Sequence, residues 1–119
     1  MKKLFIALFV LLLVACSQNP KGVVEAYYNN LDNGEITEAY KLMSKQLTGQ
    51  AGEQKIRAML QEQAKGMQKK GGIVSLATEG EAKGEIGEFT VHIVYKDGTK
   101  KDDKVSVTKE ADGWKISLR

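Results

Sequence analysis

The pattern of apolar residues changes its period at Gly71-Gly72, and this change constrains the fold more than any other feature of the chain. Before these glycines, apolar residues recur every three or four positions, which is typical of helices that bury one face. After them, apolar and polar residues alternate, which is typical of strands with one buried face. The sequence therefore predicts an α+β domain in which helices from the first half cover a sheet from the second.

Three helices are expected before the change of period. The first begins at Asn19-Pro20, where an N-cap residue precedes a proline in the first turn, and ends at 32–34, where glycine suits a left-handed cap. The second spans about Glu35 to Ser44. The third carries an apolar face from Ile56 to Met67, and the segment 48–52 between these two helices is expected to be a loop.

Four strands are expected after the change of period, at about 73–79, 86–96, 103–109 and 114–118. The Asp97-Gly98 and Asp112-Gly113 pairs are strong turn signals. Connections this short require antiparallel neighbours, so the strands form a four-stranded meander. In the first strand Val74, Leu76 and Thr78 are expected on one face. In the second strand the larger apolar set, at 89, 91, 93 and 95, is expected to face the helices.

The amino-terminal segment has a different character from the rest of the chain. Two lysines precede an unbroken run of twelve apolar residues, Leu4 to Ala15. This run is too short for a membrane-spanning helix, which needs about 20 apolar residues. A charged start followed by a run of this length is typical of a secretory signal peptide.

The stretch Leu13 to Cys16 resembles the lipobox of bacterial lipoproteins, and Cys16 is the only cysteine. The resemblance implies that the signal peptide 1–15 is removed, that the sulfur of Cys16 receives diacylglycerol and that the new amino terminus is acylated, for example by palmitate. Residues 16–19 are then a lipidated tether and 20–119 a single domain. Two or more acyl chains suffice for stable membrane anchoring. The alternative is an ordinary signal peptide followed by an incidental cysteine.

Ser17 bears on the destination of such a lipoprotein. By resemblance to Gram-negative sorting signals, a residue other than Asp after the cysteine favours the periplasmic face of the outer membrane. This expectation applies only if the organism has two membranes; otherwise the location is the cell envelope in general.

Charge and composition exclude several classes of partner and cofactor. Cleavage would leave 16 of the 18 basic residues against 15 acidic ones, a balance that gives no support for nucleic-acid binding. One cysteine and one histidine exclude a disulfide framework and His-pair zinc motifs. We expect neither a metal nor another cofactor.

The segments 20–28 and 31–35, with sequences PKGVVEAYY and LDNGE, and the final GWKI at 113–116 carry a second resemblance. Together with helices followed by a meander, they resemble small cystatin-like bacterial lipoproteins of the nuclear-transport-factor-2-like superfamily. The resemblance implies helices packed on a curved four-stranded sheet. The superfamily includes isomerases, dehydratases and non-enzymatic binding modules, so the fold alone does not assign an activity.

Candidate catalytic residues are few. His92 is expected to face away from the helices, and the acidic residues between Glu79 and Glu88 are expected to be solvated. The mixed-sign segment Lys100 to Lys104 is interpreted as a solvated hairpin arm. We therefore expect a protein that is not an enzyme, acting as an accessory module that contacts an unknown envelope protein.

Two binding surfaces follow from these expectations. A pocket between helices and sheet for an apolar ligand would be lined by Tyr27, Tyr28, Tyr40, Phe89, Tyr95 and Trp114, although these rings also suit a filled core. An interface on the outer sheet face, through which the superfamily often forms homodimers, would comprise Ile86, Thr90, His92 and Val94. A small-ligand binder and an isomerase- or dehydratase-like enzyme in the cone remain the alternatives to an accessory module.

Overall fold

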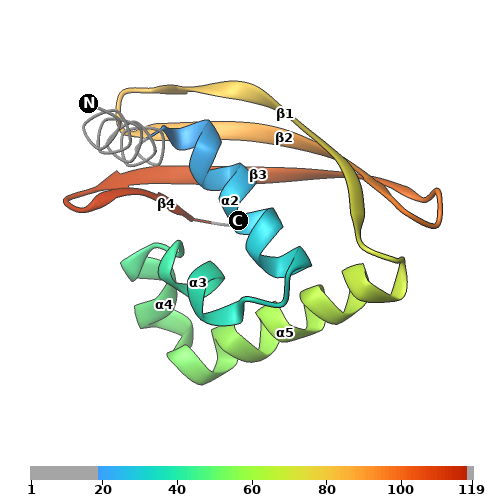
Figure 1. Ribbon diagram of the computed structural model, residues 1–119. Helices are drawn as coiled ribbons and strands as arrows, with labels where there is room; N and C mark the ends of the chain where they lie inside the picture. The colour runs from blue at the N-terminus through green and yellow to red at the C-terminus, as the bar shows by residue number, and fades with distance from the viewer. Residues whose placement is uncertain (1–18, 118–119) are drawn as a thin grey trace, which may run out of the picture.

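The computed structural model describes residues 19–117, and the expected signal peptide and lipidation site at Cys16 lie outside this range. Helices α2 (Pro20–Asp32), α3 (Ile36–Lys41), α4 (Lys45–Ala51) and α5 (Glu53–Lys69) precede strands β1 (Ile73–Lys83), β2 (Ile86–Tyr95), β3 (Lys100–Glu110) and β4 (Gly113–Ile116). Helix α2 packs on the sheet and also contacts α3 and α5 (Figure 1). Within the described range, no helix is long and apolar enough to cross a membrane.

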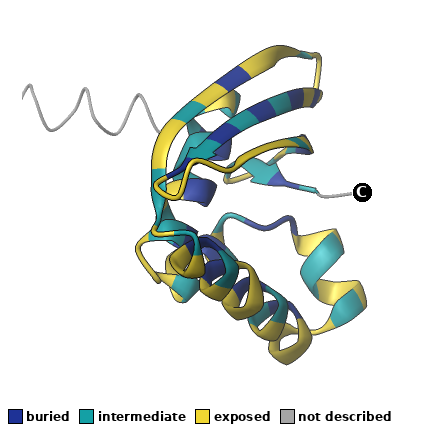
Figure 2. Cartoon of the chain, turned by 90° about the vertical axis from the view of Figure 1, so that its right-hand side faces the viewer, coloured by how far each residue is buried: buried dark blue, intermediate teal, exposed yellow. Residues whose placement is uncertain are grey.

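The sheet has the predicted topology. Its strand order is β1-β2-β3-β4, and each neighbouring pair is antiparallel. Burial alternates along β2, which appears as bands of colour in Figure 2. Its inner side chains, at positions 89, 91, 93 and 95, are buried, while Thr90, His92 and Val94 on the outer face are partly exposed. The predicted facing of β2 is therefore confirmed.

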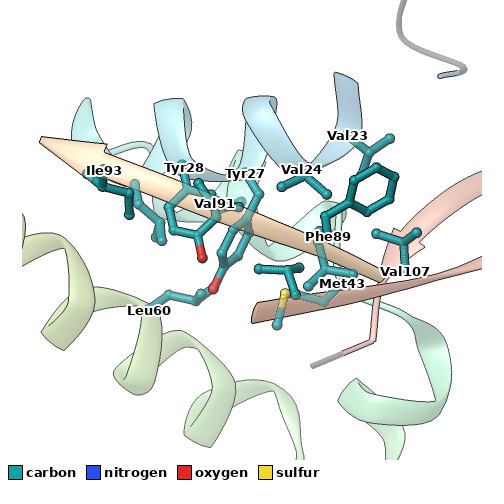
Figure 3. Close-up of a cluster of buried hydrophobic side chains, with 14 of the residues drawn as sticks. Val23, Val24, Tyr27, Tyr28, Met43, Leu60, Phe89, Val91, Ile93 and Val107 are labelled. Atoms are coloured by element: carbon teal, nitrogen blue, oxygen red, sulfur yellow. The ribbon is translucent and has the colours of Figure 1, made fainter. Parts of the chain in front are cut away.

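The core lies between the inner face of the sheet and the helices. Helix α2 contributes Val24 and Leu31, and α5 contributes Leu60, all without exposed surface. These side chains meet Val91 and Val107 from the two central strands (Figure 3). At about 25 cal/mol per Å² of buried apolar surface, this cluster dominates the stability of the domain.

The predicted second helix is shorter than expected. Helix α3 ends at Lys41, because the following residues pair with β4 instead of continuing the helix. The Ile116 N–H donates to the Leu42 carbonyl at 2.7 Å, and the Ser44 N–H donates to the Ile116 carbonyl at 2.8 Å. Ser44 then caps α4 by accepting a hydrogen bond from the Leu47 N–H. The predicted loop at 48–52 is wrong, since most of it belongs to α4, which has no buried residue and so left no apolar pattern.

The first strand also differs from its prediction. It extends to Lys83, and a bulge between Ile73 and Ser75 turns Val74 outward, so that 66% of its surface is exposed. Gly80 lies within the strand with φ +129°, where a side chain would collide with the backbone oxygen of Glu88. Only glycine fits this close approach. The glycine-rich segment 80–87 is mostly paired strand, with its turn at Gly84.

Candidate functional site

A hollow of about 430 Å³ opens between α2, α5 and the ribbon of β2 and β3. We call it the cone mouth. Its apolar wall includes Met59, Met67 and Val105. Its polar groups come from Tyr27, Tyr28, Gln63, Lys70, Tyr95, Lys101, Asp103 and Lys104. A concave surface that combines apolar side chains with a few polar groups is typical of a binding site.

Asp103 is the acidic side chain of the cone mouth. It alternates along β3 with Val105 and Val107, which are buried, so the strand directs it to the inner face. Its side chain is 28% exposed, and Lys101 lies 3.6 Å from one carboxylate oxygen. The Tyr28 hydroxyl donates a hydrogen bond to the other oxygen at 3.0 Å. The carboxylate is thus held in position from two sides.

The two tyrosines of α2 enter the same hollow. Their rings meet edge to face, with centroids 5.2 Å apart, and both project from α2 toward the space beside α5 (Figure 3). The Tyr27 hydroxyl donates to the side-chain oxygen of Gln63 at 3.0 Å. Burial, and secondarily the negative charge of Asp103, raises the pKa of both phenols well above the ordinary value. Both hydroxyls therefore stay protonated and act as hydrogen-bond donors.

Three lysines line the cone mouth, Lys70, Lys101 and Lys104. Lys101 pairs with Asp103, and the Lys70 Nζ lies 4.8 Å from the centre of the Tyr95 ring, a cation–π contact. Burial raises the pKa of Tyr95, so this phenol also remains neutral. The mouth thus offers neutral phenols, one engaged carboxylate and three lysines, a set suited to holding polar groups.

The six aromatic residues predicted for a pocket do not lie together. Tyr27, Tyr28 and Tyr95 line the cone mouth. Phe89 is buried in the core, Tyr40 stacks on the Arg57 guanidinium at 4.8 Å, and Trp114 is partly buried on β4. These three do not line the mouth.

Asp103 was missed by sequence reasoning, which placed 100–104 on a solvated arm. The signal was present in the alternation of Asp103, Val105 and Val107. It was overlooked because the mixed charges at 100–104 suggested a solvated hairpin arm, whereas β3 begins at Lys100.

The outer face of the sheet carries the residues predicted for an interface. Ile86, Thr90, His92 and Val94 all lie there, and Ile86 is 60% exposed. A second hollow, of about 490 Å³, surrounds Thr90 and is lined largely by polar residues, including Glu79, Lys104 and Ser106.

His92 connects three strands on this outer face. Its Nδ1 lies 2.8 Å from an Asp102 carboxylate oxygen on β3, and its Nε2 lies 3.3 Å from a Glu79 oxygen on β1. These hydrogen bonds, with that to Asp102 first, raise the pKa of His92 above its ordinary value. Among residues 19–117, no cluster of His, Cys, Asp and Glu is placed to hold a metal ion.

Helices packed on a curved antiparallel meander, with a hollow between the two layers, define the nuclear-transport-factor-2-like fold, and this domain has that fold. Among solved structures it is similar to a Campylobacter jejuni protein described as a "Putative NTF2-like transpeptidase". The TM-score is 0.72 at 15% identity, over 85% of this chain and 99% of that one. At this identity the likeness shows the fold alone. No family model and no curated protein matches the sequence.

Proposed function

We propose that this protein is a lipid-anchored component of the bacterial cell envelope that acts by binding, and that its binding site is the cone mouth. The observation that carries the proposal is the hydrogen-bonded pair of the buried Tyr28 and the partly exposed Asp103 at the wall of a hollow of about 430 Å³. Polar groups that are fixed in place before a ligand arrives lower the entropy cost of binding it.

The contacts of Asp103 support a binding role at this site. One carboxylate oxygen accepts a hydrogen bond from the Tyr28 hydroxyl, and the other lies 3.6 Å from the Lys101 ammonium. Both contacts hold the carboxylate in place, so that it can position a polar group of a ligand without taking a proton from it. This supports an accessory or adaptor role for the domain.

A second candidate function rests on the same pair. A carboxylate beside neutral phenols is the arrangement that a cone-type isomerase or dehydratase needs, with Asp103 as base and Tyr27 as hydrogen-bond donor. In this candidate Asp103 takes the proton through a lone pair that its contacts with Tyr28 and Lys101 leave free. It predicts that Asp103→Asn abolishes turnover while leaving ligand affinity nearly unchanged, whereas the binding role predicts that affinity falls.

The binding site is tested by photo-crosslinking in intact cells. A benzophenone amino acid is placed at Gln63, which lines the cone mouth, and at Gln61, an exposed glutamine of the same helix that does not. We expect an adduct of defined mass at Gln63 and none at Gln61. Asp103→Ala should reduce its yield several-fold. Equal adducts at both positions, or no dependence on Asp103, would contradict the cone mouth as the binding site.

The membrane anchor is tested separately. Cys16→Ala removes the thiol that the lipid requires, so labelling by a fatty-acid analogue and fractionation with membranes should both be lost. Ser117→Ala, which leaves the lipobox intact, is the matched control. Continued labelling of the Cys16→Ala chain would exclude lipidation at this position.

Self-association through the outer sheet face is also a proposal, supported by the exposed Ile86 on the same face of β2 as Thr90. Sedimentation of a chain lacking residues 1–16 measures it, with Ile86→Lys as the disrupting variant. A domain that stays monomeric at all concentrations would exclude it.

A further inference from the structure

Within the part of the chain that the structure describes, one edge of strand β3 is only partly occupied. It pairs with β2 from Lys100 to Thr108, but with β4 only from Val107 to Glu110. One further bond, from the Ser117 N–H to the Ser106 carbonyl at 2.8 Å, extends the contact. Along 100–105, no strand within the described part of the chain lies against this edge.

Alternation of backbone groups identifies which ones are free. In an antiparallel ladder, successive residues direct their N–H and C=O groups to opposite sides of the strand. Because the Ser106 carbonyl points away from β2, the backbone groups of Asp102 and Lys104 point the same way. Among residues 19–117, no backbone group is bonded to these two donors and two acceptors, which have the geometry that an added strand requires.

The cone mouth opens beside this free edge. Asp103 and Val105 line the mouth from the inner face of β3, so the hollow lies next to the inner side of the unpaired stretch. A strand added along 100–105 would direct every second side chain to that inner side. The apolar wall of the cone mouth, formed by Met59, Met67 and Val105, suits an apolar side chain of such a strand.

Charge selects the kind of strand that fits. Lys100 and Lys104 are exposed, and neither forms an ion pair within residues 19–117. The two acids of the same stretch are engaged, Asp102 by His92 and Asp103 by Tyr28. Opposite charges on neighbouring strands stabilise a pair, and like charges destabilise it. A second copy of β3 would set lysines close to lysines, so self-pairing is disfavoured.

We propose that the free edge of β3 binds an extended acidic segment of a partner protein. The segment adds as a fifth strand, sets acidic side chains near Lys100 and Lys104, and inserts an apolar side chain into the cone mouth. This inference rests on the proposed role of the cone mouth as a binding site, and it names the chemistry of the partner. Strand addition of this kind takes affinity from backbone hydrogen bonds and specificity from alternate side chains.

The test uses the full chain in detergent micelles and a defined peptide, acetyl-Glu-Val-Glu-Phe-Glu-Val-Glu-amide, followed by fluorescence anisotropy. The same peptide with lysine in place of glutamate should bind at least tenfold more weakly. N-methylation of one alternating set of amides should cause a similar loss, and methylation of the other set should not, because only one set faces β3. Equal binding of the acidic and basic peptides would overturn the inference.

Variants of β3 supply the second arm. Lys104→Pro removes an outward N–H without breaking the ladder to β2, a position where edge strands tolerate proline. We expect it to weaken binding of the acidic peptide about tenfold. Lys100→Glu with Lys104→Glu should reverse the preference between the acidic and basic peptides. Lys55→Glu, on exposed helical surface, is the matched control and should change neither. The melting temperature of each variant reports its folding.

The outcomes separate this inference from the proposed function. If the Gln63 adduct forms in cells but the acidic peptide does not bind, the strand inference fails and the cone mouth stands. If Lys104→Pro folds and binds the peptide as tightly as the original chain, the peptide lies elsewhere and the strand inference fails. If the Gln63 adduct is also absent, both fail. Self-association that Lys104→Pro abolishes would replace the acidic partner by a second copy and overturn the inference.

Discussion

The two faces of the β-sheet carry residues from the same strands but differ in what holds them in place. On the inner face of β2, Phe89, Val91 and Ile93 are at most 3% exposed and pack on helices. On the outer face, His92 is fixed by carboxylates at 2.8 and 3.3 Å while its side chain stays 39% exposed. Close packing is insensitive to pH and salt, whereas exposed charge pairs respond to both. The inner face therefore determines stability, and the outer face responds to solution conditions.

The largest expected effect is on the inner face. Ile93→Ala should lower the free energy of unfolding by about 3 kcal/mol, since a fully buried side chain leaves a cavity that neighbours fill only partly. Val94→Ala, one residue along on the outer face, is the matched control and should cost less than about 1 kcal/mol. Urea denaturation of both variants measures the contrast. Equal losses would remove the distinction between the faces.

Trp114 lies at the margin of the inner face and should show an intermediate effect. Its ring packs against the core but is only partly buried. Trp114→Ala should therefore cost about 2 kcal/mol, below the roughly 3–5 kcal/mol of a fully buried aromatic residue. Thermal and urea unfolding measure this loss. A cost as large as that of a core residue would show that β4 is covered more fully than described.

Tyr28→Phe tests the polar part of the inner face. It removes the hydrogen bond to Asp103 while keeping the ring, so it should cost about 1 kcal/mol. Tyr27→Phe, which removes the bond to Gln63, is the companion variant. If the cone mouth is a binding site, Tyr28→Phe should lower the yield of the Gln63 adduct even under conditions in which the variant stays folded. An unchanged adduct yield would separate the hydroxyl from binding.

The smallest effect belongs to the outer face and depends on pH. The hydrogen bonds to Asp102 and Glu79 raise the pKa of His92 above 6.5 in the folded domain. The protonated form therefore stabilises the fold below that pH, and this contribution is lost as pH rises through the folded pKa. NMR titration of the single histidine measures the shift. Asp102→Asn should lower this pKa more than Glu79→Gln, and an unshifted pKa would show that the His92 contacts do not persist in solution.

The fold was predictable from the sequence because its helices and strands follow burial. The period change at Gly71-Gly72, the caps at Asn19 and Gly34, and the Asp97-Gly98 turn all lie where local physics predicted them. Helix α4 was not predictable in this way, since a helix without a buried face leaves no apolar pattern. The outward turn of Val74 was equally hidden, because a bulge is a property of the strand pair.

The candidate site was less predictable than the fold. The tyrosines of α2 were identified from the sequence, because large aromatic residues on an apolar helix face tend to be inward. Asp103 was assigned to solvent, although its alternation with Val105 placed it inward. Whether an inward charged residue such as Asp103 lines a hollow depends on how far away the opposite helix lies, here α5, and the alternation along a strand does not report that distance.

The hydrogen bonds that Ile116 exchanges with Leu42 and Ser44 bear on when the domain can form during synthesis. The segment that leaves α3 receives its partner strand only after roughly seventy further residues have been made, and closing so large a loop is slow. A nascent chain emerging from the ribosome thus cannot form the hydrogen bonds of Leu42 and Ser44 until Ile116 of β4 has been made. During this delay the segment after α3 stays without its strand partner, so the contact between the helices and β4 is among the last to form.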